Sequence, residues 1–300
     1  MEKTMTGIDL SVNICGVEWK NPIATASGTY SYFESSRYYK PDRLGCITTK
    51  GVSINPWNGN PGPRIAETYG GMLNSIGLEN PGIDAYLSPS GELRMLKKAG
   101  ATVMANIAGH TVREYCEAAE KIASSEADMI ELNISCPNVE CGGLVFGRDP
   151  KAAGDLTKEV KRHCPGKPLV VKLSPNVTDI TTVALSVQEA GADAVSMINT
   201  LLGMRIDTMA GKPVLAKGSG GLSGPAIHPV AVYMVYECAK ILDIPIIAMG
   251  GVSKADDALE FFYAGAKAVA VGTAAIVDPE APVKILAELE KKIIDRREGK

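Results

Sequence analysis

The sequence predicts an α/β fold in which eight parallel strands, each followed by a helix, close into a (β/α)8 TIM barrel with an N-terminal β-hairpin. Short apolar runs alternate with longer segments of helical period along the 300 residues, and this rhythm favours parallel strands joined by right-handed crossovers. The runs are apolar throughout, as is typical of strands covered on both faces. Eight runs can be counted, the number that closes such a barrel.

The individual elements follow in order along the chain. Apolar residues recur at short intervals from Ile8 to Trp19, and this strand period predicts the hairpin. The barrel strands are expected at residues 23–26, 47–50, 103–107, 129–133, 169–173, 194–198, 246–249 and 268–271. The helices are expected at residues 32–39, 82–98, 112–124, 150–163, 179–190, 225–242, 253–264 and 279–297.

The chain contains no linker-like or low-complexity stretch, so we expect one domain over residues 1–300. Two connections, residues 51–81 and 199–225, are unusually long. Both follow a strand, and long ordered loops at the carboxyl ends of barrel strands are where the chemistry of this fold resides.

Composition excludes several classes of function. Lys and Arg total 31 against 34 Asp and Glu, so no basic surface for nucleic acid is expected. No apolar run reaches the ~20 residues of a membrane helix, and no signal peptide is recognisable. The seven cysteines form no C-x-x-C pair and only three histidines occur, so neither disulfides nor a metal site are expected. Reduced thiols indicate a cytoplasmic protein.

The strand ends would face one another around a single cavity, and they carry polar residues and glycines. These are Ser27, Lys50 with Gly51, Asn106, Asn133, Lys172, Asn199 with Thr200, Gly250 with Gly251, and Gly272 with Thr273. Taken alone, each lysine is equally consistent with an anion site and with a side chain that points outward or pairs with a carboxylate. Two lysines at the same relative position favour an anion site. The glycines after the last two strands predict phosphate binding, because barrels often bind phosphate there.

The segment ELNISCPN, residues 131–138, points to a chemical step. A cysteine thiol, with an unperturbed pKa of about 8.5, can take up a proton near neutral pH, and asparagine both donates and accepts hydrogen bonds. A lone cysteine is more often a buried structural residue. With its amide neighbours, Cys136 instead predicts a site that binds a polar planar substrate and abstracts one proton. Residues 218–224 lack the G-x-G-x-x-G spacing and follow no strand, so no Rossmann-type site is expected.

Six segments together resemble class 1 dihydroorotate dehydrogenase. They are ITTKGVS (47–53), NSIGLENPG (74–82), ELNISCPN (131–138), VKLSP (171–175), INT (198–200) and AMGGV (248–252). The resemblance covers roughly residues 8–290. A further segment, CGGLVFG (141–147), resembles the class 1B catalytic subunit more than the class 1A enzyme.

The resemblance implies FMN at the carboxyl end of the barrel and oxidation of (S)-dihydroorotate to orotate in de novo pyrimidine biosynthesis. Cys136 would remove the C5 proton, and hydride would pass from C6 to flavin N5. The implied substrate residues are Lys50, Asn74, Ser75, Ile76, Gly77, Leu78, Asn133, Asn199 and Thr200. The implied FMN residues are Ser27, Lys50, Gly51, Asn106, Asn133, Lys172, Ile198, Gly224, Gly250, Gly251, Gly272 and Thr273.

The class 1B resemblance also implies a partner subunit that carries FAD and a [2Fe–2S] cluster and passes electrons to NAD+, in a heterotetramer of two plus two. The four-cysteine pattern of such a cluster does not occur in this chain. The alternatives are a class 1A-type fumarate-reducing homodimer, a dihydropyrimidine dehydrogenase-type flavoprotein, and a non-redox phosphate-binding aldolase or synthase. The last would use Lys50 or Lys172 as a Schiff-base amine.

Overall fold

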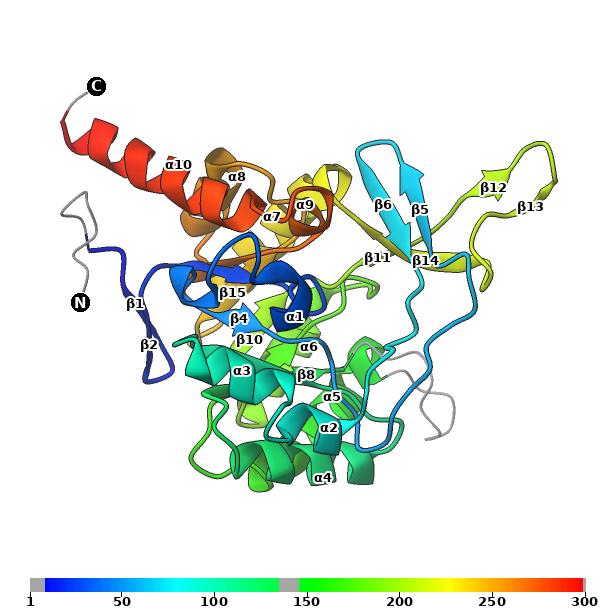
Figure 1. The fold of residues 1–300 in the computed structure, drawn as a ribbon, viewed down its shortest axis with the longest axis horizontal. Helices are drawn as coiled ribbons and strands as arrows, with labels where there is room; N and C mark the ends of the chain where they lie inside the picture. The colour runs from blue at the N-terminus through cyan, green and yellow to red at the C-terminus, as the bar shows by residue number, and fades with distance from the viewer. Residues whose placement is uncertain (1–8, 135–145, 299–300) are drawn as a thin grey trace.

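A parallel eight-stranded sheet forms the centre of the molecule (Figure 1). The computed structural model describes residues 9–134 and 146–298. The strand order is β3-β16-β15-β10-β9-β8-β7-β4, so every strand lies beside its neighbour in the chain, and the last lies beside the first. A parallel bridge between Ala24 and Cys46 joins the two outer strands and closes the ring. The predicted barrel is therefore confirmed.

The observed barrel strands fall within the predicted runs. They are β3 (Ile23–Thr25), β4 (Ile47–Thr48), β7 (Val103–Ile107), β8 (Met129–Asn133), β9 (Leu169–Lys172), β10 (Ala194–Met197), β15 (Ile246–Met249) and β16 (Ala268–Val271).

Helices cover the outside of the ring (Figure 1). They are α1 (Tyr32–Ser35), α2 (Ile83–Leu87), α3 (Glu92–Lys98), α4 (Val112–Ala123), α5 (Pro150–Arg162), α6 (Ile180–Glu189), α7 (His228–Ala239), α8 (Ala255–Tyr263), α9 (Thr273–Val277) and α10 (Ala281–Arg297). Side chains of Thr111, Asp149 and Asp179 accept hydrogen bonds from the first turns of α4, α5 and α6, which fixes where these helices begin. No helix in the described ranges has the length and apolar character that crossing a membrane requires.

Two helix predictions need correction. The single helix predicted over residues 82–98 is two helices, because Pro89 lacks the N–H group that a continuous helix would need. The helix predicted over residues 32–39 ends at Ser35. Here the Ser35 hydroxyl accepts from the backbone N–H of Ser31, an example of the local bonding by which serine competes with helix propagation.

The N-terminal hairpin closes one end of the barrel. Strands β1 (Val12–Ile14) and β2 (Val17–Trp19) pair antiparallel across a turn in which Cys15 and Gly16 have φ of 54° and 87°. Ile14 and Trp19 are fully buried, in one cluster with inward-facing barrel residues such as Met104 and Met129. The hairpin is therefore a plug at the amino-terminal end of the barrel.

We expect Trp19→Ala to lower the free energy of unfolding by about 3–5 kcal/mol, the usual cost of emptying the site of a large buried aromatic side chain. Urea denaturation followed by circular dichroism measures the change. Trp19→Phe is the matched control and should cost less, because the ring is retained. Equal stability of the alanine variant and the wild type would contradict the role of the hairpin as a plug.

Farther along the barrel axis, the inward-facing residues become polar. Residues two apart in a strand share a face, so Asn106 follows Met104, Glu131 follows Met129 and Lys172 follows Val170. All three polar side chains are buried. The expectation of uniformly apolar strands is therefore wrong at this level, and the reason is that a polar layer lies between the apolar plug and the carboxyl ends of the strands.

The two long connections form a second sheet, which no pattern in the sequence predicts. Strands β5 (Ile65–Thr68) and β6 (Gly71–Asn74) come from the first, and β11 (Leu201–Met204) and β14 (Ser219–Ser223) from the second. They pair antiparallel in the order β11-β14-β6-β5. A short hairpin of β12 (Ile206–Asp207) and β13 (Lys212–Pro213) extends from this sheet, away from the barrel (Figure 1).

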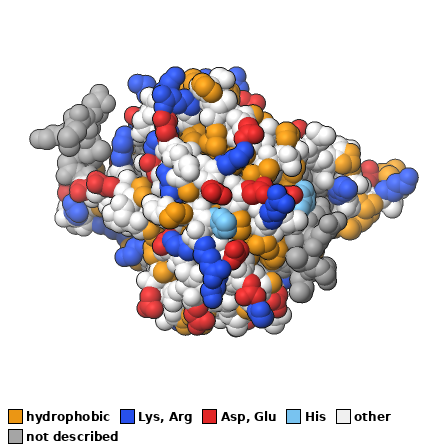
Figure 2. Space-filling model, turned by 90° about the horizontal axis from the view of Figure 1, so that it is seen from below, with side chains coloured by type: hydrophobic (Ala, Val, Ile, Leu, Met, Phe, Trp, Pro, Cys, Tyr) orange, Lys and Arg blue, Asp and Glu red, His pale blue; other side chains and the backbone are white. Residues whose placement is uncertain are grey.

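Charged side chains of both signs are interspersed over the face of the molecule shown in Figure 2. This pattern is what a nearly balanced composition, with a net charge of −3, produces.

Candidate active site

A cavity of about 800 Å³ lies between the carboxyl ends of the barrel strands and the four-stranded sheet. Its lining brings together eighteen of the residues that were predicted for the site. They are Ser27, Lys50, Gly51, Asn74, Ser75, Ile76, Gly77, Leu78, Asn106, Asn133, Lys172, Ile198, Asn199, Thr200, Gly250, Gly251, Gly272 and Thr273. Gly224 is not in the lining but packs against Gly251. Cys136 lies outside the described residues.

The cavity is electropositive. Lys50, Arg148, Lys172 and Lys217 line it, whereas none of the described lining residues is acidic. The Lys172 side chain is 5% exposed, and its Nζ donates to Ser27 Oγ at 3.0 Å. Because a buried cation is costly without a counter-charge, this end of the barrel is suited to an anion.

Lys50 lies beside Gly28, the residue that follows Ser27 in the chain. A Cβ atom at Gly28 would lie 3.3 Å from Lys50 Cδ, so a glycine here leaves room for the lysine stem. Burial lowers the pKa of the Lys50 ammonium; Glu79 opposes the shift, and Lys172 reinforces it. The two lysines are thus close enough to influence one another, as their matching strand positions predicted.

Asn106 is held by the polar layer beneath it. Its Nδ2 donates to Glu131 Oε2 at 2.5 Å, and Ser196 Oγ donates to the other oxygen of Glu131 at 2.6 Å. Asn106 Oδ1 is buried and has no hydrogen-bond partner among the described residues. Since buried acceptors are nearly always paired, this oxygen fits a hydrogen-bond donor on a bound molecule.

The glycine turn after β15 is tightly packed. Gly251 has a φ of 73°, and a Cβ atom there would lie 2.7 Å from His228 Cβ and 2.8 Å from the Gly224 carbonyl oxygen. The His228 ring nitrogen Nδ1 lies 2.8 Å from the Gly250 carbonyl oxygen. Only glycine satisfies both the conformation and the space, so the main chain is what this turn presents to the cavity.

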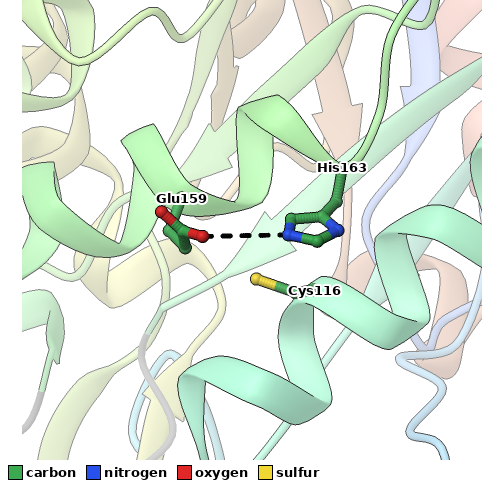
Figure 3. A group of neighbouring side chains, drawn as sticks. All are labelled: Cys116, Glu159 and His163. Carbon is green, nitrogen blue, oxygen red and sulfur yellow. Dashed lines mark ion pairs between the residues drawn. The ribbon is translucent and has the colours of Figure 1, made fainter.

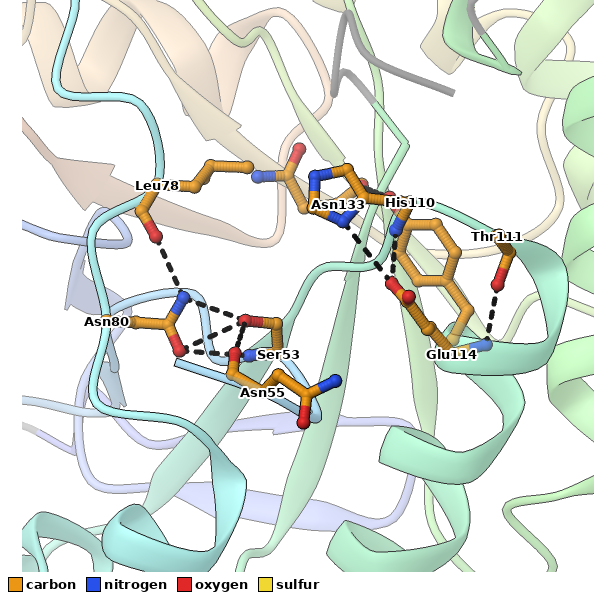
Figure 4. A network of polar contacts seen from close by, with 9 residues as sticks. Ser53, Asn55, Leu78, Asn80, His110, Thr111, Glu114 and Asn133 are labelled. Carbon is orange, nitrogen blue, oxygen red and sulfur yellow. Dashed lines mark hydrogen bonds and ion pairs between the residues drawn. The ribbon is translucent and has the colours of Figure 1, made fainter. Parts of the chain in front are cut away.

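A polar network shapes the loop that contains Asn74 to Leu78 (Figure 4). Asn80 Oδ1 accepts from the backbone N–H groups of Ser53 at 3.2 Å and Gly82 at 2.9 Å. Asn80 Nδ2 donates to the Leu78 carbonyl oxygen at 2.8 Å. Leu78 has a φ of 54°, and in Figure 4 its side chain points toward Asn133. The network therefore fixes an unusual backbone conformation directly at the cavity wall.

Several lining residues were not predicted: Thr29, Asn60, Arg148, Ser174, Asn176 and Lys217. Asn176 Nδ2 donates to the Thr200 carbonyl oxygen at 2.9 Å, and its Oδ1 accepts from Leu202 N–H at 2.8 Å. It lies directly after the VKLSP segment, so its position at a strand end was a usable signal. Asn60 and Lys217 come from the long connections, whose paths the sequence did not reveal.

Comparison with known proteins gives the family. A family model described as dihydroorotate dehydrogenase matches residues 9–293. The chain belongs to the dihydroorotate dehydrogenase family. The resemblance that six segments carried is thus confirmed, and membership of this family disagrees with the aldolase or synthase alternative.

Relatives within the family are similar over nearly their whole length. A protein of Alkaliphilus metalliredigens is 50% identical over 95% of this chain and 94% of its own. A protein of Geobacillus kaustophilus is 51% identical over 95% of this chain and 91% of its own. A protein of Geobacter sulfurreducens is 50% identical over 96% of this chain and 94% of its own. Each is named as the catalytic subunit of dihydroorotate dehydrogenase B (NAD+).

Proposed function

We propose that this dihydroorotate dehydrogenase oxidises (S)-dihydroorotate to orotate with FMN, as the catalytic subunit of a NAD+-linked enzyme of de novo pyrimidine biosynthesis. One observation carries the proposal. The cavity at the carboxyl end of the barrel combines the amides of Asn74, Asn133 and Asn199 with Lys50 and Lys172, and no acidic residue is among its described lining.

The substrate's chemistry matches this lining. Dihydroorotate carries a carboxylate and an imide-like edge of alternating N–H and C=O groups. Asparagine amides can pair with that edge in both directions, and Lys50 supplies a counter-charge for the carboxylate. We assign substrate binding to Lys50, Asn74, Ser75, Ile76, Gly77, Leu78, Asn133, Asn199 and Thr200.

The other half of the lining fits FMN. The unpartnered oxygen of Asn106 suits an N–H donor, Lys172 suits an electron-rich ring, and the tight glycine turn suits a phosphate. Bound FMN would supply N5 as the acceptor of the hydride that leaves C6. We assign its binding to Ser27, Lys50, Gly51, Asn106, Asn133, Lys172, Ile198, Gly224, Gly250, Gly251, Gly272 and Thr273.

We assign to Cys136 the role of the base that removes the C5 proton. This residue follows β8 and Asn133 in the chain. Loss of one proton and one hydride accounts for the two-electron oxidation of the C5–C6 bond. A base must lie within hydrogen-bond reach of the proton, in a site closed to bulk water. The sheet of β5, β6, β11 and β14 lies over the cavity and supports such closure.

The electrons are proposed to leave through a partner subunit that carries FAD and a [2Fe–2S] cluster and reduces NAD+, in a cytoplasmic heterotetramer of two plus two. The names of the relatives, as catalytic subunits of an NAD+ enzyme, support the existence of a partner subunit and the link to NAD+. A fumarate-reducing homodimer and a dihydropyrimidine dehydrogenase-type flavoprotein are the competing functions. Turnover with fumarate by the chain alone would favour the first of these, and NAD+ reduction only after addition of an iron–sulfur partner favours the heterotetramer.

The visible spectrum tests the proposal directly. The purified chain should be yellow, and anaerobic addition of dihydroorotate should bleach the flavin absorption. A colourless protein that cannot be reconstituted with FMN, or a flavin band that dihydroorotate leaves unchanged, would refute the proposed function.

We expect Asn80→Ala to raise the KM for dihydroorotate about tenfold, because loss of a buried hydrogen-bond network costs about 1–3 kcal/mol and here releases the loop that contains Asn74 to Leu78. Steady-state kinetics and flavin content are the measurements, and flavin content should stay unchanged. Asn58→Ala, at an exposed asparagine of the same long connection, is the control and should behave as wild type. An unchanged KM in Asn80→Ala would show that the network does not position the loop.

A further inference from the structure

A cluster of side chains whose types can bind a metal lies between α4 and α5, on the outside of the barrel. Cys116 and Glu120 are one helical turn apart on α4, and Glu159 and His163 are one turn apart at the end of α5. Residues with this spacing share a helix face. None of the four lines the active-site cavity, so the cluster is separate from the site described above.

The geometry brings three different ligand types together (Figure 3). The ligand atoms of Cys116, Glu159 and His163 all lie within 4.8 Å of one another. His163 Nε2 is 3.8 Å from Glu159 Oε1, which is too long for a hydrogen bond. The Cys116 thiol has no hydrogen-bond partner among the described residues, although the residue is only 6% exposed. The three groups therefore do not hydrogen-bond to one another, although the other oxygen of Glu159 accepts from Arg162 Nη1 at 2.8 Å.

We propose that Cys116, Glu159 and His163 bind a thiophilic divalent cation of the Zn²⁺ class, which links α4 to α5, with water as the fourth ligand. Ligand atoms around tetrahedral zinc lie about 3.5 Å apart, given metal–ligand distances of about 2.0–2.3 Å. The observed group therefore needs to contract by only about 1 Å, which rotation of side chains can supply.

Glu120 places a carboxylate near the second ring nitrogen of His163, as is usual for a histidine that binds a metal. Its Oε2 lies 3.9 Å from His163 Nδ1, on the ring nitrogen that does not face Glu159. Metal-bound histidines generally donate their other N–H to a carboxylate, which fixes the ring and its tautomer. We therefore assign Glu120 to orienting His163.

The competing interpretation is a surface ion-pair cluster of His163 with two glutamates. It assigns no function to the sulfur, and this difference makes the two interpretations separable. A metal site requires the Cys116 thiolate, whereas the ion pairs of His163 with the glutamates would persist if Cys116 were replaced.

Cadmium binding to the full-length, flavin-loaded protein tests the proposal. After removal of metals, Cd²⁺ is titrated and the ultraviolet thiolate-to-cadmium charge-transfer band is followed, with Zn²⁺ as competitor. We expect Cys116→Ser to lose the absorbance that corresponds to one bound Cd²⁺ per chain. His163→Gln and Glu159→Gln should each weaken Cd²⁺ binding at least tenfold. Cys238→Ser, at a buried cysteine of α7, is the control and should bind as wild type.

Thermal melting gives a second readout. Zn²⁺ at about a hundredfold excess over its Kd should raise the Tm of the wild type by about 5 °C, and that of Cys116→Ser by much less. Turnover should be the same in all these variants. A cadmium band of wild-type size in Cys116→Ser would mean that metal binds only to other thiols and would overturn the proposal, as would the lack of any Tm increase in the wild type.

Discussion

Cys136→Ala should abolish dihydroorotate oxidation while FMN stays bound. A positioned general base contributes about 10²–10⁴-fold to a rate, and no other described residue in the cavity lining is a thiol or a carboxylate that could replace it. Steady-state turnover, flavin content and anaerobic flavin bleaching should be measured on the same preparation. The proposal requires intact flavin content together with a loss of bleaching.

Two further variants make the result specific. Cys136→Ser should retain a little activity, and least at neutral pH, because a hydroxyl gives up and takes up protons far less readily than a thiol in that range. Cys238→Ala, at a buried cysteine outside the cavity, should have normal turnover. Near-normal activity of Cys136→Ala would assign the base to a different residue while leaving the flavin assignment intact.

The second large effect is expected at Gly251. Gly251→Ala should lower FMN affinity at least tenfold, because the new methyl group would lie 2.7 Å from His228 Cβ and 2.8 Å from the Gly224 carbonyl oxygen. The turn would have to move, and the main-chain groups proposed to receive the phosphate would move with it. Equilibrium dialysis of the apoprotein against FMN measures the change.

Gly166→Ala is a closely matched control. Gly166 has a φ of 77°, almost the same as the 73° of Gly251, but a Cβ atom at Gly166 would meet nothing within 4 Å. Both variants therefore carry the backbone cost of an alanine in the left-handed region, about 1–2 kcal/mol, and only Gly251→Ala adds the displacement of the turn. Equal FMN affinities in the two variants would contradict the placement of the phosphate.

The barrel was predictable because its signals are local. Each barrel strand is a short apolar run between helical segments, as β3, β7, β8 and β15 illustrate. The alternation of such runs with helical segments determines the topology almost uniquely. Lys50 and Lys172 were placed correctly at the cavity for the same reason, since the carboxyl ends of parallel strands meet at one end of a barrel.

The four-stranded sheet was not predictable in this way, because its pairing is long-range. Strand β14 consists of SGGLS, a sequence with little intrinsic preference for a strand, and it pairs with β6 from a connection far earlier in the chain. The polar layer has a partial signal in the sequence, but its arrangement is long-range. Glu131 interrupts an apolar run just as Lys172 does, but the function of its carboxylate depends on Asn106 and Ser196, which lie on two other strands.

The plug formed by Ile14 and Trp19 has a consequence for the catalytic cycle. Among the described residues, apolar side chains close the amino-terminal end of the barrel, so the proposed reactant and product would enter and leave at the carboxyl end, beneath the four-stranded sheet. On the proposed function, orotate would have to leave the cavity before the next dihydroorotate binds, and accumulated orotate should competitively inhibit dihydroorotate oxidation.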